Sequence, residues 1–249
     1  MTGLMRHDLY AELYQVENSH WWHQHKRAMV KQLISKIKPG RVLDVGCGTG
    51  KILAELKKQG WQVWGVDAEP AAAKECQKRD IKIKIADATI RMPFKDNFFN
   101  AILALDFLEH VNDDKTVIRG IKRVLKPNGI IIISVPAYPK LYSYWDKMLG
   151  HYRRYSKSDL TQLMIKSGLK IKFISYYFSW LLLPSIMIRI IKKILNIKTV
   201  SDFKTNTDNF LILNIIKLLS RTELWLLKYT KMPFGLSLIC VATPNNSQS

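Results

Sequence analysis

Polar and apolar positions along the chain follow two alternating periods. Short apolar runs, typical of buried strands, are separated by segments in which apolar positions recur every three or four residues, typical of amphipathic helices. Repeated strand–helix units of this kind predict a doubly wound, mostly parallel sheet with right-handed crossovers, which is an α/β fold. The expected strands are 41–45, 61–66, 81–86, 100–105, 130–135, 169–176 and 235–242, and the expected helices are 7–38, 49–59, 69–79, 113–125 and 156–166.

Local signals support several of these boundaries. Pro39-Gly40 ends the first helical segment, and Asp113 begins a helix that carries Lys and Arg in its last turn. Ser156 and Asp159 have the spacing of a capping box, and Gly168 ends the helix that they begin. Pro127-Asn128-Gly129 is expected to turn the chain into the central strand.

The length of 249 residues suits one large α/β domain with additions. We expect a single domain, 1–249, without a linker or an internal repeat. Its expected parts are an N-terminal helical lid at 1–39, a cofactor-binding half at 40–135, a substrate side at 136–176, an amphipathic helical insertion at 177–232 and a last strand at 235–242.

The strongest local motif is Leu43-Asp-Val-Gly-Cys-Gly-Thr-Gly50, directly after the first strand. Its glycines allow a sharp turn and the close approach of a ligand. A dinucleotide site would need Gly-x-Gly-x-x-Gly, but Lys51 stands at the third glycine position and would obstruct helix–strand packing. Asp44 precedes the glycines and suits a cofactor that carries an ammonium group rather than a pyrophosphate.

Two further acids end the next two strands. Asp67 follows the second strand, where a carboxylate can accept both ribose hydroxyls, and Asp87 follows the third, where it could hold the adenine amino group. Because parallel strands end at one edge of the sheet, we expect Asp44, Asp67 and Asp87 to face the same crevice.

With these motifs, the chain resembles the class I S-adenosylmethionine-dependent methyltransferases, in particular a bacterial type with a His-Trp-Trp N-terminal segment. Leu43–Gly50, Gly65-Val-Asp67 and Ala86-Asp-Ala88 are similar to the first three motifs of that family, and Arg123–Gly129 is similar to the turn before its fifth strand. The resemblance implies a seven-stranded, Rossmann-like sheet whose last strand is antiparallel, and S-adenosylmethionine as cofactor. The cofactor-binding residues that it implies are Asp44, Gly46, Cys47, Gly48, Asp67, Ala68, Asp87, Ala88 and Leu105.

Methyl transfer to a protonated nucleophile needs a base. His110 follows the fourth strand, and an imidazole can accept a proton near neutral pH. His151 and Tyr155, in Gly150-His-Tyr-Arg-Arg-Tyr155, are the alternatives. Asp106-x-x-Glu-His110 is similar to a metal-binding stretch of quinone-biosynthesis O-methyltransferases, but Asp replaces the first Glu, and we assign no metal to the site.

The residues expected on the substrate side are Trp21, Trp22, Arg153 and Arg154. The two tryptophans could cover the crevice as part of a lid or pack the N-terminal helix as core residues, and both roles are compatible. Arg27 could pair with the cofactor carboxylate or belong to a solvated basic face.

The net charge of +19 is concentrated outside the cofactor half. Residues 40–110 hold 11 basic and 10 acidic side chains, whereas 166–231 hold 12 basic and 3 acidic. The apolar runs of the insertion are too short for a transmembrane helix, but apolar helices bordered by Lys and Arg are typical of an anionic membrane surface. The alternative is that the helices of the insertion pack on the sheet or on a second subunit.

We therefore expect an S-adenosylmethionine-dependent methyltransferase that acts on an oxygen of a lipidic or lipid-linked acceptor. Three cysteines and the absence of a long apolar stretch in residues 1–10 indicate the cytoplasm, with peripheral association at the inner face of its membrane. An RNA methyltransferase and a non-catalytic S-adenosylmethionine-binding subunit are the alternatives. Nucleic acid is not the expected partner, because the basic residues lie among long aliphatic runs.

Overall fold

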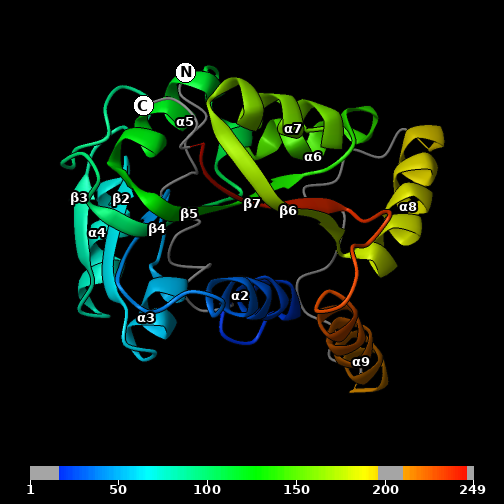
Figure 1. Ribbon diagram of the computed structural model, residues 1–249. Helices are drawn as coiled ribbons and strands as arrows, with labels where there is room; N and C mark the ends of the chain where they lie inside the picture. The colour runs from blue at the N-terminus through cyan, green and yellow to red at the C-terminus, as the bar shows by residue number, and fades with distance from the viewer. Residues whose placement is uncertain (1–16, 196–209, 246–249) are drawn as a thin grey trace.

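A seven-stranded mixed sheet forms the centre of the computed structural model, which describes residues 17–195 and 210–245 (Figure 1). The strand order is β3-β2-β1-β4-β5-β7-β6, and β7 is antiparallel to both of its neighbours. The strands are β1 (Arg41–Val45), β2 (Gln62–Asp67), β3 (Lys82–Ile85), β4 (Phe99–Leu105), β5 (Leu125–Pro136), β6 (Leu169–Tyr177) and β7 (Ser237–Pro244). The expected Rossmann-like architecture, with its antiparallel last strand, is confirmed.

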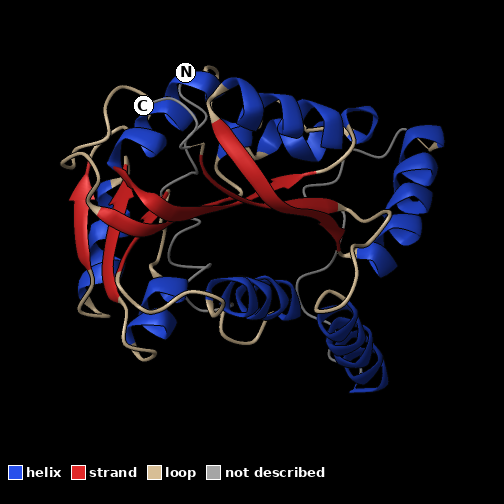
Figure 2. Cartoon of the chain, viewed as in Figure 1, coloured by secondary structure: helices blue, strands red, loops and turns tan. Residues whose placement is uncertain are grey.

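Helices cover both faces of the sheet (Figure 2). Residues of α5 and α7 pack in one apolar cluster, and residues of α2, α3 and α4 pack in a second cluster on the other face. The described helices are α2 (Trp21–Ile34), α3 (Lys51–Lys57), α4 (Pro70–Gln77), α5 (Asp114–Val124), α6 (Tyr144–Met148), α7 (Lys157–Lys166), α8 (Leu182–Ile194) and α9 (Phe210–Leu226), with 3-10 turns η1 (Leu108–His110), η2 (Pro139–Leu141) and η3 (Ser179–Leu181).

The capping signals are present in the structure. Asp113 accepts a hydrogen bond from the Thr116 amide at the start of α5, and Ser156 and Asp159 form the expected capping box of α7. Gly168 has a φ of +72°, a left-handed conformation that favours glycine at the end of α7. These caps fix where the two helices begin and end relative to the sheet.

Some expected boundaries differ from the observed ones. β5 begins at Leu125, so 127–129 lie within the strand instead of forming a free turn, and the pairing register with β4 shifts there. The helix expected over 49–59 begins only at Lys51, because Gly50 adopts a left-handed φ of +70°. The sequence pattern did not predict α6. Residues 7–16 of the first expected helix lie outside the described residues.

The insertion expected at 177–232 contains two described helices, α8 and α9, which lie on the same side of the molecule, at the right in Figure 1. None of the described helices is long and apolar enough to cross a bilayer.

Candidate active site

The loop between β1 and α3 is shaped by three glycines with left-handed backbones. A Cβ on Gly46 would lie 2.5 Å from Phe107, and one on Gly50 would lie 2.8 Å from the Cys76 sulfur. A Cβ on Gly48, in contrast, would meet nothing within 4 Å. The outer two glycines therefore satisfy packing inside the protein, whereas the surface above Gly48 is open to a ligand.

Asp67, the last residue of β2, holds this glycine loop in place. Its Oδ2 accepts a hydrogen bond from the Gly48 amide at 2.9 Å, and its Oδ1 accepts one from the Glu69 amide at 3.0 Å. The carboxylate expected to bind the ribose thus also joins the end of β2 to the glycine loop. Ala68, the next residue, is half-buried.

Asp44 lies beside Asp67 and is almost fully buried. Burial raises the pKa of its carboxyl well above the usual value, the nearby Asp67 raises it further, and Lys26 only partly opposes this. Its Oδ1 has no hydrogen-bond partner among the described residues. A buried acceptor without a partner beside an open glycine surface fits a ligand that brings a hydrogen-bond donor or a positive charge.

The residues expected near the adenine lie in the loop after β3 and at the end of β4. Asp87 Oδ1 accepts hydrogen bonds from the Thr89 amide at 2.8 Å and the Thr89 hydroxyl at 2.6 Å, which orders the loop after β3. Ala88 is buried, and Leu105 is half-buried at the end of β4. Cys47 is buried, and its sulfur lies 3.9 Å from that of Cys76 under the glycine loop.

The basic side chain that lies near Asp44 and Asp106 is that of Lys26, whereas Arg27 has other partners. Lys26 Nζ lies 2.5 Å from Asp106 Oδ2, directly after β4, and Asp106 Oδ1 accepts a hydrogen bond from Ser134 at 2.6 Å. Burial would raise the pKa of Asp106, but Lys26 and the Ser134 hydroxyl lower it below its usual value.

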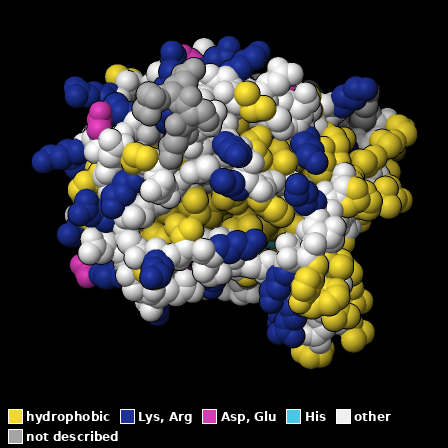
Figure 3. All heavy atoms as spheres, in the orientation of Figure 1, with side chains coloured by type: hydrophobic (Ala, Val, Ile, Leu, Met, Phe, Trp, Pro, Cys, Tyr) yellow, Lys and Arg dark blue, Asp and Glu magenta, His cyan; other side chains and the backbone are white. Residues whose placement is uncertain are grey.

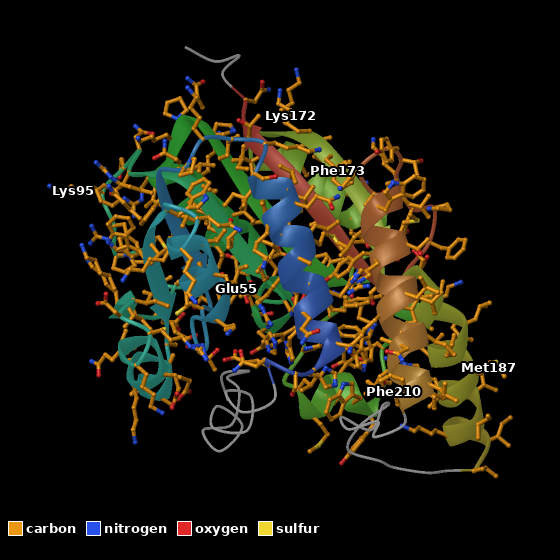
Figure 4. The ribbon with its side chains drawn as sticks, turned by 90° about the horizontal axis from the view of Figure 1, so that it is seen from below. Glu55, Lys95, Lys172, Phe173, Met187 and Phe210 are labelled. Carbon is orange, nitrogen blue, oxygen red and sulfur yellow. The ribbon has the colours of Figure 1, made fainter. Side chains whose placement is uncertain are left out.

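Arg27 has different partners from those expected. It donates hydrogen bonds to Glu55 at 2.8 Å and to the Glu17 carbonyl at 2.8 Å, and Figure 4 shows Glu55 reaching from α3 toward α2. A role at the cofactor carboxylate would require Arg27 to leave both partners. Lys26 is paired as well, with Asp106, but it also lies close enough to Asp44 to oppose the rise in the pKa of that carboxyl.

A histidine–aspartate pair lies in the segment expected on the substrate side. His151 Nδ1 lies 3.0 Å from Asp146 Oδ1, which also accepts a hydrogen bond from Arg154 at 2.8 Å. Burial would raise the pKa of Asp146, but the hydrogen bond to His151 and the Arg154 guanidinium outweigh it and lower the pKa to about 2. Asp146 is therefore an ionised acceptor, which requires a proton on Nδ1 of His151 and directs Nε2 away from the pair.

The ring of His110 lies edge-to-face against that of His151, and the two ring centroids are 4.7 Å apart. Tyr155, the third expected candidate, is buried, and its hydroxyl donates to Asp114 at 2.9 Å and to the Leu108 carbonyl at 3.2 Å. Burial raises the pKa of Tyr155 far above its usual value. This environment suits a structural hydroxyl rather than a base.

The two arginines expected to bind substrate are engaged within the protein. Arg153 contacts Asp114 at 3.2 Å and the Asn112 carbonyl at 2.6 Å. Arg154 is buried against Asp146 and donates to the Ala137 carbonyl. These contacts indicate that Arg154 acts by positioning Asp146, and they leave Arg153 at the edge of the site.

The aromatic pair at the start of α2 packs against the segment that leads into α8. Trp22 stacks on Phe178 with centroids 3.9 Å apart, and Trp21 lies 5.4 Å from Trp180. These are the contacts of core residues. A role for the pair in covering the acceptor stays a proposal.

Glu109, His110 and His151 bring their ligand atoms within 4.8 Å of one another. Burial, reinforced by Asp106, raises the pKa of Glu109 well above its usual value, and its Oε2 has no partner among the described residues. The group could hold a divalent cation. However, Asp106 is turned toward Lys26, so the expected pair of carboxylates does not converge, and one carboxylate with two imidazoles is a poor site for Mg²⁺ or Ca²⁺.

Sequence reasoning missed Lys26 and Asp146. Asp146 is the third residue of a helix whose cap is Ser143, and this Ser-x-x-Asp capping box was a usable signal. Lys26 stands one position before the arginine that was named, and nothing local distinguishes which of the two faces inward.

A doubly wound sheet of this order, with an open glycine loop after β1 and acids that fit an ammonium group and a ribose, defines a class I S-adenosylmethionine-dependent methyltransferase. The chain belongs to the family described as "Methyltransferase domain", whose model matches residues 21–172.

Relatives and solved structures agree with this class. The chain is 33% identical over 134 residues to a ubiquinone biosynthesis O-methyltransferase of Rickettsia typhi, covering 46% of this chain and 54% of that protein. The corresponding protein of Rickettsia prowazekii is 32% identical over 154 residues, covering 54% and 60%. The chain thus spans little more than half the length of these curated relatives.

Two solved structures show the same fold at low sequence identity. The first comes from the complex of the Haloferax volcanii Trm112 methyltransferase activator with a methyltransferase, with a TM-score of 0.65, 17% identity and 97% coverage of both chains. The second is a S-adenosylmethionine-dependent methyltransferase from Thermotoga maritima, with a TM-score of 0.60, 17% identity and 95% coverage of both chains.

Gly46→Ala is expected to cost roughly 1–3 kcal/mol of unfolding free energy, because alanine must adopt a left-handed backbone and its Cβ would clash with Phe107. The loop would shift, and thermal stabilisation by S-adenosylhomocysteine should disappear. Gly120→Ala in α5 is the matched control, because a Cβ there meets nothing closer than 3.8 Å and should stabilise the helix. A Gly46→Ala protein with an undiminished ligand-induced shift would contradict this assignment of the loop.

Proposed function

We propose that the protein methylates an oxygen of a lipidic or lipid-linked acceptor at the inner surface of the cytoplasmic membrane. The Asp146–His151 pair carries this proposal, because it gives the crevice an oriented base and a hydroxyl nucleophile has a proton to lose. S-adenosylmethionine supplies an electrophilic methyl group on a sulfonium when it is bound.

Residues of the sheet edge would hold this cofactor. Asp67 would accept hydrogen bonds from the ribose, and Asp87 with Ala88 would meet the adenine. Asp44 and the surface of Gly48 would lie along the methionyl part, with Lys26 as the nearby cation for its carboxylate. A crevice with both buried acids and one lysine suits a group that carries both an ammonium and a carboxylate.

His151 would accept the acceptor's proton at Nε2. Asp146 fixes the tautomer and the ring plane, and it stabilises the imidazolium that forms, while Arg154 holds Asp146 in turn. The acceptor oxygen would gain the methyl group as its proton passes to Nε2, the carbon–sulfur bond of the sulfonium would break to leave a neutral thioether, and the imidazolium would later release that proton to water. Holding the reacting groups in line would supply the rest of the rate enhancement.

Two observations support a lipidic acceptor. The curated relatives named above are O-methyltransferases of ubiquinone biosynthesis, and ubiquinone is a lipid. In addition, α8 and α9 expose large apolar side chains, and Arg189 of α8 donates a hydrogen bond to the Leu141 carbonyl in the segment between β5 and α6. A soluble polar acceptor would explain neither feature.

Transfer of a labelled methyl group to a phenol with a long alkyl tail tests the proposal, with the untailed phenol and the equally tailed amine as comparison acceptors. We expect the tailed phenol to be preferred in kcat/KM by about tenfold or more over the untailed one, because buried methylenes contribute binding energy. Transfer should persist in EDTA. Preference for the amine would contradict O-methylation, and activity lost in EDTA but restored by Mn²⁺ or Zn²⁺ would make His151 a metal ligand instead of the base.

A further inference from the structure

Apolar side chains gather in two patches, one over α8 and one over α9, on the side of the molecule that the two helices share, and together these patches are called the α8–α9 face (Figure 3). Its central side chains are between 56% and 76% exposed, which is unusual for such large apolar groups. They are Leu183, Met187 and Ile194 on α8, and Ile215, Leu218 and Trp225 on α9. On each helix the spacing of these residues places them on one face.

Among the described residues of α8 and α9, the exposed charges have one sign. Lys217 and Arg221 are exposed on one side of α9 next to the apolar face, and Lys228, also exposed, lies in the turn after the helix ends at Leu226; these three residues are the basic stripe. α8 contains no acidic residue, and the one acid of α9, Glu223, is only 4% exposed. Trp225 and Tyr229, whose rings lie 5.3 Å apart, add the aromatic groups that are favoured at the boundary between lipid and water.

Buried contacts fix this surface relative to the crevice. Glu223 accepts hydrogen bonds from the amides of Phe178 and Ser179 at 2.9 and 2.7 Å, and it lies 2.7 Å from His25 of α2. His25 directly precedes Lys26, the crevice lysine. α9 is therefore held by buried contacts against α2, the helix that carries Lys26.

We infer that the α8–α9 face binds an anionic lipid leaflet, with both helices lying in the plane of the membrane and the crevice facing its surface. This deepens the proposed function and rests on it for the identity of the acceptor. Apolar side chains would enter the acyl boundary while the basic stripe meets lipid phosphates. A second copy of this chain fits less well, because both copies carry +19 and a two-fold contact would bring like-charged stripes together.

Flotation with vesicles tests this inference with the full-length protein and without any methyl acceptor. Vesicles of phosphatidylcholine mixed with phosphatidylglycerol should carry the protein upward, whereas vesicles of phosphatidylcholine alone should carry much less of it, and added salt should weaken the binding. Ile215→Glu, at a site 57% exposed on α9, should lower the partition coefficient by about tenfold or more. Ile165→Glu, at a site 61% exposed on α7, is the matched control and should leave partition unchanged.

Each other outcome contradicts the inference in a recognisable way. Equal binding to neutral vesicles would remove the role of the basic stripe, and equal loss in both variants would show that the face is not specific. A protein that stays in the aqueous fraction and dimerises through Ile215 in light scattering would assign the face to a second copy. Thermal stabilisation by S-adenosylhomocysteine and transfer to the untailed phenol are measured on the same samples. A protein that does not bind vesicles is thereby distinguished from one that does not bind the cofactor or transfer a methyl group.

Discussion

Replacement of His151 by alanine is expected to lower kcat for methyl transfer about 10²- to 10⁴-fold, the usual contribution of a positioned general base. Affinity for S-adenosylhomocysteine should change by about twofold or less, because the imidazole acts on the acceptor and not on the cofactor. Single-turnover rates with a phenolic acceptor and calorimetric titration of S-adenosylhomocysteine measure the two effects separately. A normal kcat in the His151→Ala protein would show that His151 is not the base, and His110 would become the candidate.

The positioning role of Asp146 can be separated from its role as a helix cap. Asp146 and Asp159 occupy equivalent places in two capping boxes, but only Asp146 also contacts His151. Asp146→Asn should therefore lower kcat by roughly 10²-fold or more, because the wrong tautomer of His151 becomes available. Asp159→Asn should lose only a helix cap. If both variants lower kcat equally, Asp146 matters only for the fold of α6.

The pH dependence of stability gives an independent check on Asp146. Its pKa in the folded protein, about 2, lies below the usual value of 3.8, so the contribution to stability is complete above the unfolded value and is lost as pH falls from about 4 toward 2. Asp146→Asn should flatten this part of the acid-unfolding curve.

The cofactor half was predictable from sequence because its signals are local. A glycine-rich turn directly after an apolar strand and acids directly after the next two strands need no knowledge of distant contacts, and parallel strands bring their carboxyl ends to one edge. The structure accordingly places Asp44 and Asp67 together at the glycine loop. The repeated units also predicted a doubly wound sheet, whereas the antiparallel last strand was implied only by the family resemblance.

The inward cation was not predictable, because it depends on a pairing between distant parts of the chain. The buried stripe of α2 runs through Trp21, His25, Met29 and Leu33, and His25 is a polar member of it because Glu223 lies opposite on α9. Because position 25 is polar, the apolar pattern of the sequence does not show which face of the helix is buried at this point. Neighbouring helix positions differ by about 100°, so a one-residue shift exchanges Lys26 for Arg27.

The acceptor side was only partly predictable for a related reason. His151 was named from its motif, but its partner lies in α6, a helix of five residues that is too short to show a period. Helix α6 is defined by its capping box instead. The histidine was therefore found from sequence, and the residue that orients it was not.

Asp67→Asn is expected to weaken binding of S-adenosylhomocysteine by about 100-fold, since each hydrogen bond to a charged group contributes roughly 1.5–3 kcal/mol and 1.4 kcal/mol is tenfold in affinity. The effect has two sources. The amide offers weaker acceptance to the ribose hydroxyls, and its NH₂ group would face the amide of either Gly48 or Glu69, both of which now donate to the carboxylate. Calorimetric titration measures the loss directly.

The same substitution at Asp80 separates the site from the loss of a charge as such. Asp80 follows α4, its side chain is 95% exposed and it pairs with Lys57 at the surface, so Asp80→Asn removes one negative charge from the solvent-exposed surface. It should leave affinity for S-adenosylhomocysteine unchanged. If both variants bind equally well, the Asp67 carboxylate is needed neither for the glycine loop nor for the ribose, which must then be held elsewhere. If Asp67→Asn alone loses affinity, the end of β2 belongs to the cofactor site, because the carboxylate there orders the glycine turn and stands where the ribose is expected.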